Sequence, residues 1–98
     1  MGQGRGTPQD YEQAVFWYRK AARQKVADAH HLLCLSYSLG HGVVSNRIKG
    51  YAWCQVAVAF GSEDAKAALP LIAKTMTTTK VKAGKHLSAR IIRRIQRQ

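Results

Sequence analysis

The chain has 98 residues, 46% of them apolar, and its 16 lysines and arginines outweigh 5 acidic residues to give a formal net charge of +11. A chain of this length forms one domain, and its apolar content excludes disorder throughout. The two cysteines are too few for a disulfide scaffold, and no apolar run approaches the ~20 residues that a membrane-spanning helix needs. The positive charge favours nucleic acid, anionic lipid or an acidic protein face as a partner.

The sequence repeats itself at a spacing of 36 residues. When Gly4–Leu35 is laid over Gly40–Leu71 without a gap, eight of the 32 pairs are identical, where ~2 would match by chance. The identical pairs are Gly4/Gly40, Gly6/Gly42, Trp17/Trp53, Ala21/Ala57, Asp28/Asp64, Ala29/Ala65, Leu33/Leu69 and Leu35/Leu71. A period of this length is typical of stacked helical hairpins.

The first unit predicts two helices separated by a short break. Asp10 is the expected N-cap of the first, with Gln13 completing a capping box. Apolar residues then recur at helical spacing up to a break near residues 24–26. A second helix is expected at about 27–39, ended by Gly40 and Gly42.

The second unit repeats this pattern with one complication. Asn46 is the expected cap of a helix at about 47–60, and Gly61-Ser62 turns into the next helix. Pro70 lies inside that helix, where it lacks an N–H and costs about 3 kcal/mol. We therefore expect a kink near 66–69, or a helix that restarts at Pro70.

The last predicted helix, at about 78–97, follows a threonine cluster that supplies its cap. One face of this helix is apolar, with Val81, Gly84, Ser88, Ile91 and Ile95 at alternating spacings of three and four. The other face is cationic and has no acidic residue. Its basic residues are Lys82, Lys85, Arg90, Arg93, Arg94 and Arg97.

The segment from Asp10 to Ala22, with Ala27-Asp28-Ala29 and the later run Tyr37 to Val43, resembles the Sel-one-like repeat (SLR), a relative of the tetratricopeptide repeat. The second unit matches more loosely, and residues 74–90 resemble the helix that often closes bacterial members. Lys25, Cys34 and Cys54 depart from the usual residues, and Pro70 interrupts a helix.

The resemblance implies an all-α fold, an α/α superhelical solenoid of helical hairpins with a C-terminal amphipathic capping helix. It divides a single domain, residues 1–98, into four parts. These are a partial repeat at 1–25 (a loop and a second helix), a full repeat at 26–61, the first helix of a next repeat at 62–76, and a basic capping helix at 77–98.

The resemblance also implies a scaffold or adaptor that binds a protein partner and is not an enzyme. Because the first unit is incomplete, we expect the chain to be a fragment of a longer repeat protein or to self-associate through the exposed face of its first helix. No signal peptide is visible in residues 1–10. The compartment, cytoplasmic or periplasmic, stays open.

Two groups of residues gain a role from the resemblance alone. The partner-binding groove maps to Asp28, His31, Leu35, Ser38, Leu39, Leu71 and Lys74. Cys34 and Cys54 are expected to face each other within one hairpin. Two buried, reduced cysteines are the favoured interpretation, and a disulfide is the alternative.

The residues themselves indicate no catalytic site, metal or cofactor. His30 and His31 are neighbours, about 100° apart on a helix, so they cannot share one face as metal ligands do. The basic helix at the C-terminus either seals the stack or docks on an anionic partner. It has no interleaved aromatics for base stacking, so an acidic protein ranks ahead of nucleic acid or anionic membrane.

Overall fold

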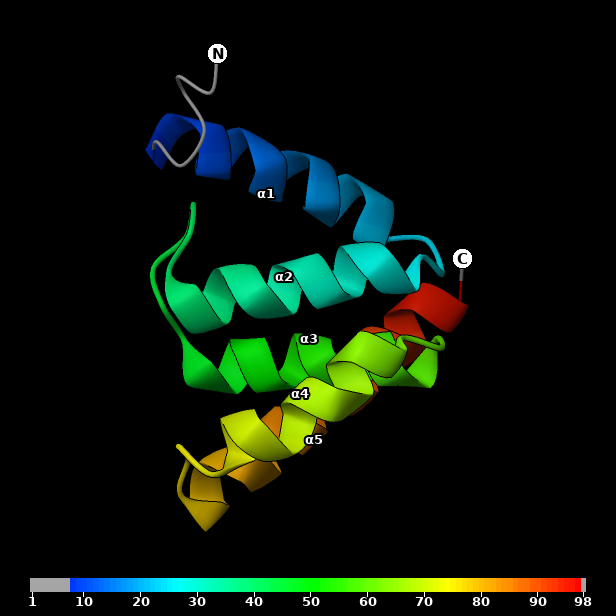
Figure 1. Cartoon of the computed structure of the whole chain (residues 1–98). Helices are drawn as coiled ribbons and strands as arrows, with labels where there is room; N and C mark the ends of the chain where they lie inside the picture. The colour runs from blue at the N-terminus through cyan, green and yellow to red at the C-terminus, as the bar shows by residue number, and fades with distance from the viewer. Residues whose placement is uncertain (1–7, 98) are drawn as a thin grey trace.

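A computed structural model describes residues 8–97, and every regular element in that part is an α-helix. The helices are α1 (Pro8–Ala22), α2 (Ala27–Leu39), α3 (Arg47–Ala59), α4 (Glu63–Ala73) and α5 (Thr78–Gln96) (Figure 1). The all-α class is therefore confirmed. The expected loop at residues 2–6 lies outside the described part of the chain.

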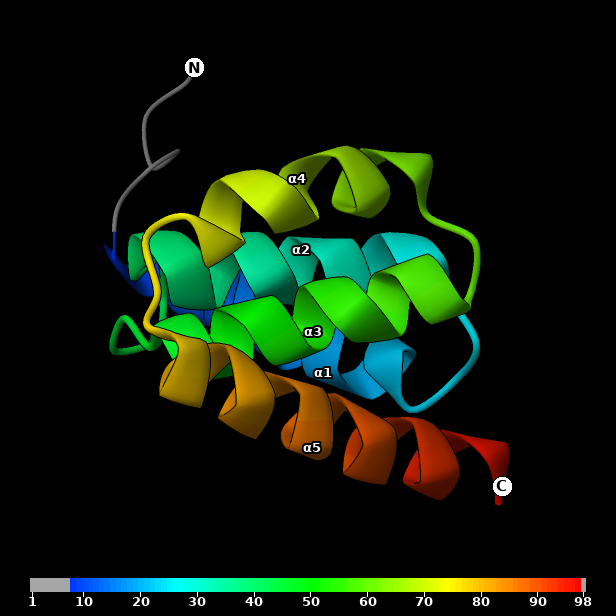
Figure 2. The ribbon, with the colours of Figure 1, turned by 90° about the horizontal axis from the view of Figure 1, so that it is seen from below.

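The helices form two layers that run through the stack. Figure 2 shows α2 and α4 on one side and α1, α3 and α5 on the other. From α1 to α4 each helix packs on the next one in the chain, whereas α5 packs on α3, so α3 contacts α2, α4 and α5. This alternation of layers is the arrangement of an α/α solenoid, in which each hairpin buries its apolar face on its neighbours.

Side-chain caps fix the starts of three helices. The Asn46 side chain accepts a hydrogen bond from the Lys49 amide, Ser62 accepts one from Ala65, and Thr77 accepts one from Lys80. Each cap satisfies an amide that has no partner within its helix. These caps confirm the expected starts of α3 and α5.

The predicted start of the first helix is wrong. α1 begins at Pro8, which places Asp10 in the first turn rather than at the N-cap. Proline suits the first helical position because its φ is already fixed near the helical value and its missing N–H would have no helical partner there. Asp10 still adds a favourable negative charge at the positive end of the helix dipole.

The helix containing Pro70 does not restart there. α4 runs without interruption from Glu63 to Ala73, and the Pro70 carbonyl accepts a bond from the Lys74 amide. Apolar residues on both sides of the proline pack into the same cluster, Ala65 before it and Ile72 after it. This shared packing holds the two halves in one helix despite the missing hydrogen bond.

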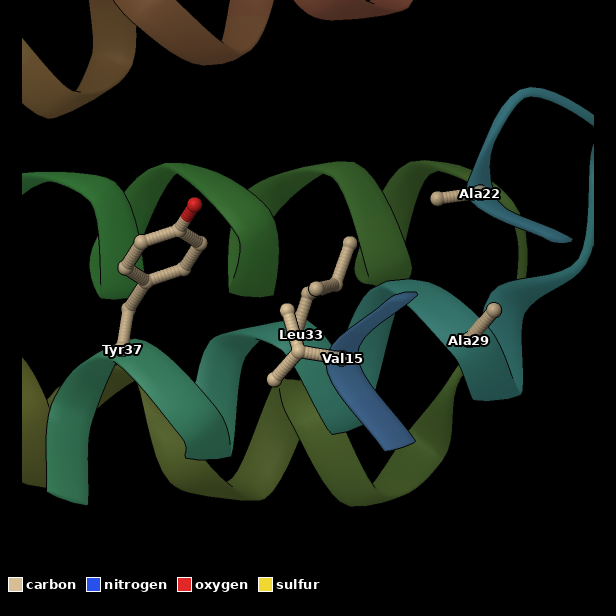
Figure 3. Close-up of a cluster of buried hydrophobic side chains, with 5 residues drawn as sticks. All are labelled: Val15, Ala22, Ala29, Leu33 and Tyr37. Atoms are coloured by element: carbon tan, nitrogen blue, oxygen red, sulfur yellow. The ribbon is translucent and has the colours of Figure 1, made fainter. Parts of the chain in front are cut away.

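Two apolar clusters make up the core. The first, between α1 and α2, contains Val15, Ala22, Ala29, Leu33 and Tyr37, and Figure 3 shows Val15 and Leu33 side by side. The second joins α2, α3 and α4 and contains Cys34, Cys54, Ala57 and Ala65. On α5 the predicted apolar face packs against α3, with Gly84, Ser88 and Ile95 buried.

The loop between α2 and α3 folds back onto the beginning of α1. Gly42 adopts a positive φ of 80°, and a Cβ at this position would overlap the Tyr11 carbonyl. The His41 ring stacks on the Tyr11 ring with centroids 4.2 Å apart. The loop that joins α2 to α3 thereby holds the beginning of α1. Only glycine at position 42 allows the two backbones to come this close.

Candidate interaction surfaces

The groove residues lie on α2 or α4, or directly after α4, and none of them is buried. Leu39 is 60% exposed, Leu71 is 64% exposed, and Leu35 is 36% exposed. His31 and Ser38 are half-buried, whereas Asp28 and Lys74 are exposed. These helices therefore present an apolar surface in which leucines are interspersed with polar side chains.

Two of the groove residues meet in a small cavity. Ser38 and Leu71 line a space of about 230 Å³ together with Arg47, Ile72 and Thr75. The Arg47 guanidinium donates to the Thr75 carbonyl at 3.3 Å, which ties the start of α3 to the end of α4. The other groove positions do not line this cavity.

The basic face of α5 is exposed throughout. The residues that the sequence assigned to it are Lys82, Lys85, Arg90, Arg93, Arg94 and Arg97, and all are exposed. No ion pair to another residue within 8–97 neutralises any of them. Since the opposite face of the helix packs on α3, the charge points away from the core.

A disulfide joins Cys34 of α2 to Cys54 of α3. The two cysteines face each other, as expected, but the favoured interpretation of two reduced thiols is not what the structure contains. Their Cα atoms are 5.1 Å apart, which is within the range that a disulfide requires. Both residues are fully buried, so the bond crosses the centre of the hairpin.

A cleft between α1, α3 and α5 was not foreseen from the sequence. We call it the basic cleft, and its volume is about 410 Å³. It is lined by Arg19, Ala22, Arg23, Trp53, Ile91, Arg94 and Ile95. Its lining residues come from three regions that are far apart in the sequence, so no local sequence pattern predicts the cleft.

His30 supports the floor of the basic cleft from within the core. Its Nε2 atom lies 3.0 Å from the Ala22 carbonyl, and because a carbonyl can only accept, Nε2 must carry the proton. Its ring stacks on Trp53 with centroids 5.8 Å apart. From the sequence, His30 was considered only as a metal ligand, so its role beneath the cleft was not predicted.

The neutral form of His30 is favoured by its surroundings. Burial lowers the pKa of the imidazole below its usual 6.5, and this effect outweighs the backbone hydrogen bonds that raise it. The Nδ1 atom is buried and has no hydrogen-bond partner among the described residues. A proton added at Nδ1 would therefore be a buried donor without an acceptor.

The described residues contain neither a candidate metal cluster nor a candidate membrane span. No group of three or more histidine, cysteine or acidic side chains in residues 8–97 could hold a metal ion. In the same part of the chain, no helix has the length and apolarity to cross a bilayer. The notable features of this part of the chain are three surfaces, namely the leucines on α2 and α4, the basic face of α5, and the basic cleft.

Comparison with known families agrees with the helical architecture. The family model of the Sel1 repeat matches residues 1–26 and 27–59, which is more than half of the chain. Sel1 repeats are helical hairpins that generally serve as protein-interaction modules and are typically non-catalytic. No curated protein matches the chain. With this match over two successive units, the chain belongs to the Sel1 repeat family.

Proposed function

We propose that this protein is a non-catalytic adaptor that binds a protein partner along the outer surface of α2 and α4. The observation that carries the proposal is the exposure of Leu35, Leu39 and Leu71 on these two helices. Leucines that are exposed together on adjacent helices, with polar side chains around them, are typical of a protein-binding surface. We call these residues, with Asp28, His31, Ser38 and Lys74, the leucine groove.

The charge of the chain favours an acidic partner. Lysines and arginines outnumber acidic residues by 16 to 5, and the basic side chains of α5 are exposed. Such a field accelerates encounter with an acidic protein and repels a basic one. The leucine groove would then supply most of the affinity, because apolar contacts persist where salt screens charges.

An anion-binding module is the alternative function. The exposed cationic face of α5 supports it, since a run of basic side chains without acidic neighbours suits phosphates of nucleic acid or an anionic membrane. The absence of aromatic residues on α5 weighs against nucleic acid, because base stacking usually requires them.

An affinity capture separates these functions. The protein is immobilised and exposed to lysate of its source cell at ~150 mM salt, with and without nuclease, and retained proteins are quantified by mass spectrometry. We expect a discrete protein that survives nuclease. Changing both Leu39 and Leu71 to serine should lower its retention about tenfold, because apolar anchors dominate such interfaces.

The matched control is Val44→Ser. Val44 is 90% exposed and lies in the loop between α2 and α3, outside the leucine groove. This variant should retain the partner as the unchanged protein does. If both variants retain the partner equally, the leucine groove is not the binding site. If nuclease removes all retained protein, the function is anion binding instead.

A further inference from the structure

The basic cleft lies on the opposite side of the molecule from the leucine groove. The groove is on α2 and α4, whereas the cleft is formed by α1, α3 and α5, the other layer in Figure 2. A ligand in the cleft would therefore leave the groove free. The cleft is a candidate site separate from the leucine groove, and a ligand can bind there whether or not the groove binds a partner.

The lining of the cleft combines two kinds of surface. Its apolar part is formed by Ala22, Trp53, Ile91 and Ile95, and its polar side chains are Arg19, Arg23 and Arg94. No acidic side chain lines it. A site of about 410 Å³ with an apolar floor and a few convergent polar groups has the composition of a ligand pocket.

The arginines are available to a ligand. No ion pair within residues 8–97 engages Arg23 or Arg94, and both side chains are exposed. Arg19 is partly held in place, because its Nη2 donates to the Tyr37 hydroxyl at 2.8 Å. A guanidinium that is fixed by one bond still has other N–H donors for a carboxylate, and less entropy is lost when it binds.

The apolar floor of the basic cleft limits which anions can bind there. A bare phosphate or carboxylate would leave the half-buried Trp53 and Ile91 in contact with water, so the ligand needs an apolar group beside its charge. The side chains that line the cleft include no hydrogen-bond acceptor for the amino groups of nucleic-acid bases. An apolar amino-acid side chain needs no hydrogen-bond acceptor, and the two parallel N–H groups of a guanidinium match the two oxygens of a carboxylate.

We propose that the basic cleft binds a partner segment in which an aromatic or leucine side chain is flanked by aspartate or glutamate. The apolar side chain lies on Trp53 and the two isoleucines, and the flanking carboxylates accept hydrogen bonds from the arginines. The structure thus assigns this protein a second protein-binding site, selective for acidic and apolar residues together.

The experiment uses Trp53 as the reporter. The chain contains two tryptophans, so W17F leaves Trp53 alone, and Trp17 is 62% exposed and outside the cleft. In this background, tryptophan fluorescence and the Trp53 indole N–H signal in NMR follow titration with acetyl-Glu-Glu-Leu-Phe-Glu-Asp-amide. We expect a saturable change. A peptide with glutamine and asparagine in place of the acids should bind at least about tenfold more weakly.

Arg94 and Arg93 provide a matched pair. They are neighbours on α5 and both are exposed, but only Arg94 lines the cleft. R94E and R93E lower the net charge equally, so R94E should weaken peptide binding about tenfold and R93E less than twofold. R23E and K25E form a second pair at the end of α1, and circular dichroism verifies that all four variants are folded.

Several results would overturn the proposal. One is equal weakening by R93E and R94E, which would mean diffuse attraction by the whole positive surface. Others are equal binding of the uncharged peptide, or a Trp53 response only to a uridine oligonucleotide or to phosphatidylglycerol vesicles. L39S/L71S should bind the peptide as the unchanged protein does. The experiment can therefore contradict binding at the cleft without contradicting binding at the leucine groove, and the reverse.

Discussion

Gly42 shows how one residue joins two hairpins. Its φ of 80° disfavours any side chain, and a Cβ would also overlap the Tyr11 backbone. Gly61 is a suitable control, because its φ is 106° but nothing lies within 4 Å of its Cβ position. We expect G61A to lower the free energy of unfolding by about 1 kcal/mol and G42A by at least about 3 kcal/mol. Equal losses in urea denaturation would contradict the contact between the loop and α1.

His30 predicts how stability depends on pH. Because burial lowers its pKa in the folded state, the unfolded chain binds the proton more readily. The stabilising contribution of neutral His30 is therefore complete above about pH 6.5 and is lost as the pH falls through and below that value. Denaturation curves between pH 7.5 and 5 should show this loss.

The variants H30Q and H86Q test the assignment. Glutamine at position 30 can still donate to the Ala22 carbonyl but does not titrate. H30Q should therefore remove most of the decline with falling pH, although its stability at pH 7.5 is lower. H86Q changes an exposed histidine on α5 and should keep the decline. If the free energy of unfolding of H30Q declines with falling pH as in the unchanged protein, other groups cause the decline.

Among the elements, α2 and α3 form the hairpin with the strongest constraint. Cys34 and Cys54 enclose a loop with a sequence separation of 20, and closing such a loop stabilises a fold by about 3 kcal/mol. Unfolding in the presence of a reductant, or of the C34A/C54A variant, should show a loss of this size. Alkylation of the unreduced, denatured protein should leave both cysteines unlabelled. Two labelled thiols would mean that the hairpin is not crosslinked.

The helices and their order could be predicted because their signals are local. Asn46 and Thr77 precede apolar periodicity, and glycine at position 40 ends α2 with a φ of 74°. The start of α1 was misplaced because Asp10 and Pro8 are both plausible first-turn residues. The helix does not restart at Pro70, because apolar residues on both sides of it pack into one cluster, and this is a tertiary effect.

The surfaces were only partly predictable. The basic residues of α5 follow one helical face, so their exposure could be read from spacing. The basic cleft could not, because Arg19, Trp53 and Arg94 come from three helices. The role of His30 was hidden for the same reason, since its partners Ala22 and Trp53 are distant in sequence.

At the scale of the whole molecule, α1 has an aromatic surface that no helix within residues 8–97 covers. Phe16 is 52% exposed and Trp17 is 62% exposed, their rings meet edge to face at 5.4 Å, and Lys20 lies over both. Aromatic side chains exposed in this way favour association, because a partner surface removes them from water. We therefore propose that two copies associate through α1.

Sedimentation equilibrium tests this association. The unchanged protein should show a monomer–dimer equilibrium at micromolar concentration, and F16S/W17S should shift it toward monomer by about tenfold or more. L39S/L71S changes two equally exposed apolar residues on the other layer and should leave the equilibrium unchanged. A single monomeric species at all concentrations, with a sharp melting transition, would contradict the proposed association through α1.

The crosslink between α2 and α3 also limits how far the chain can be stretched. If the ends of the protein are pulled apart, the segment from Cys34 to Cys54 carries no load, because the tension passes through the sulfur atoms. The fully extended length is then shorter by about 65 Å than that of the reduced chain. Under mechanical load the segment between the two cysteines would thus stay a short, inextensible link, whatever happens to the helices outside it.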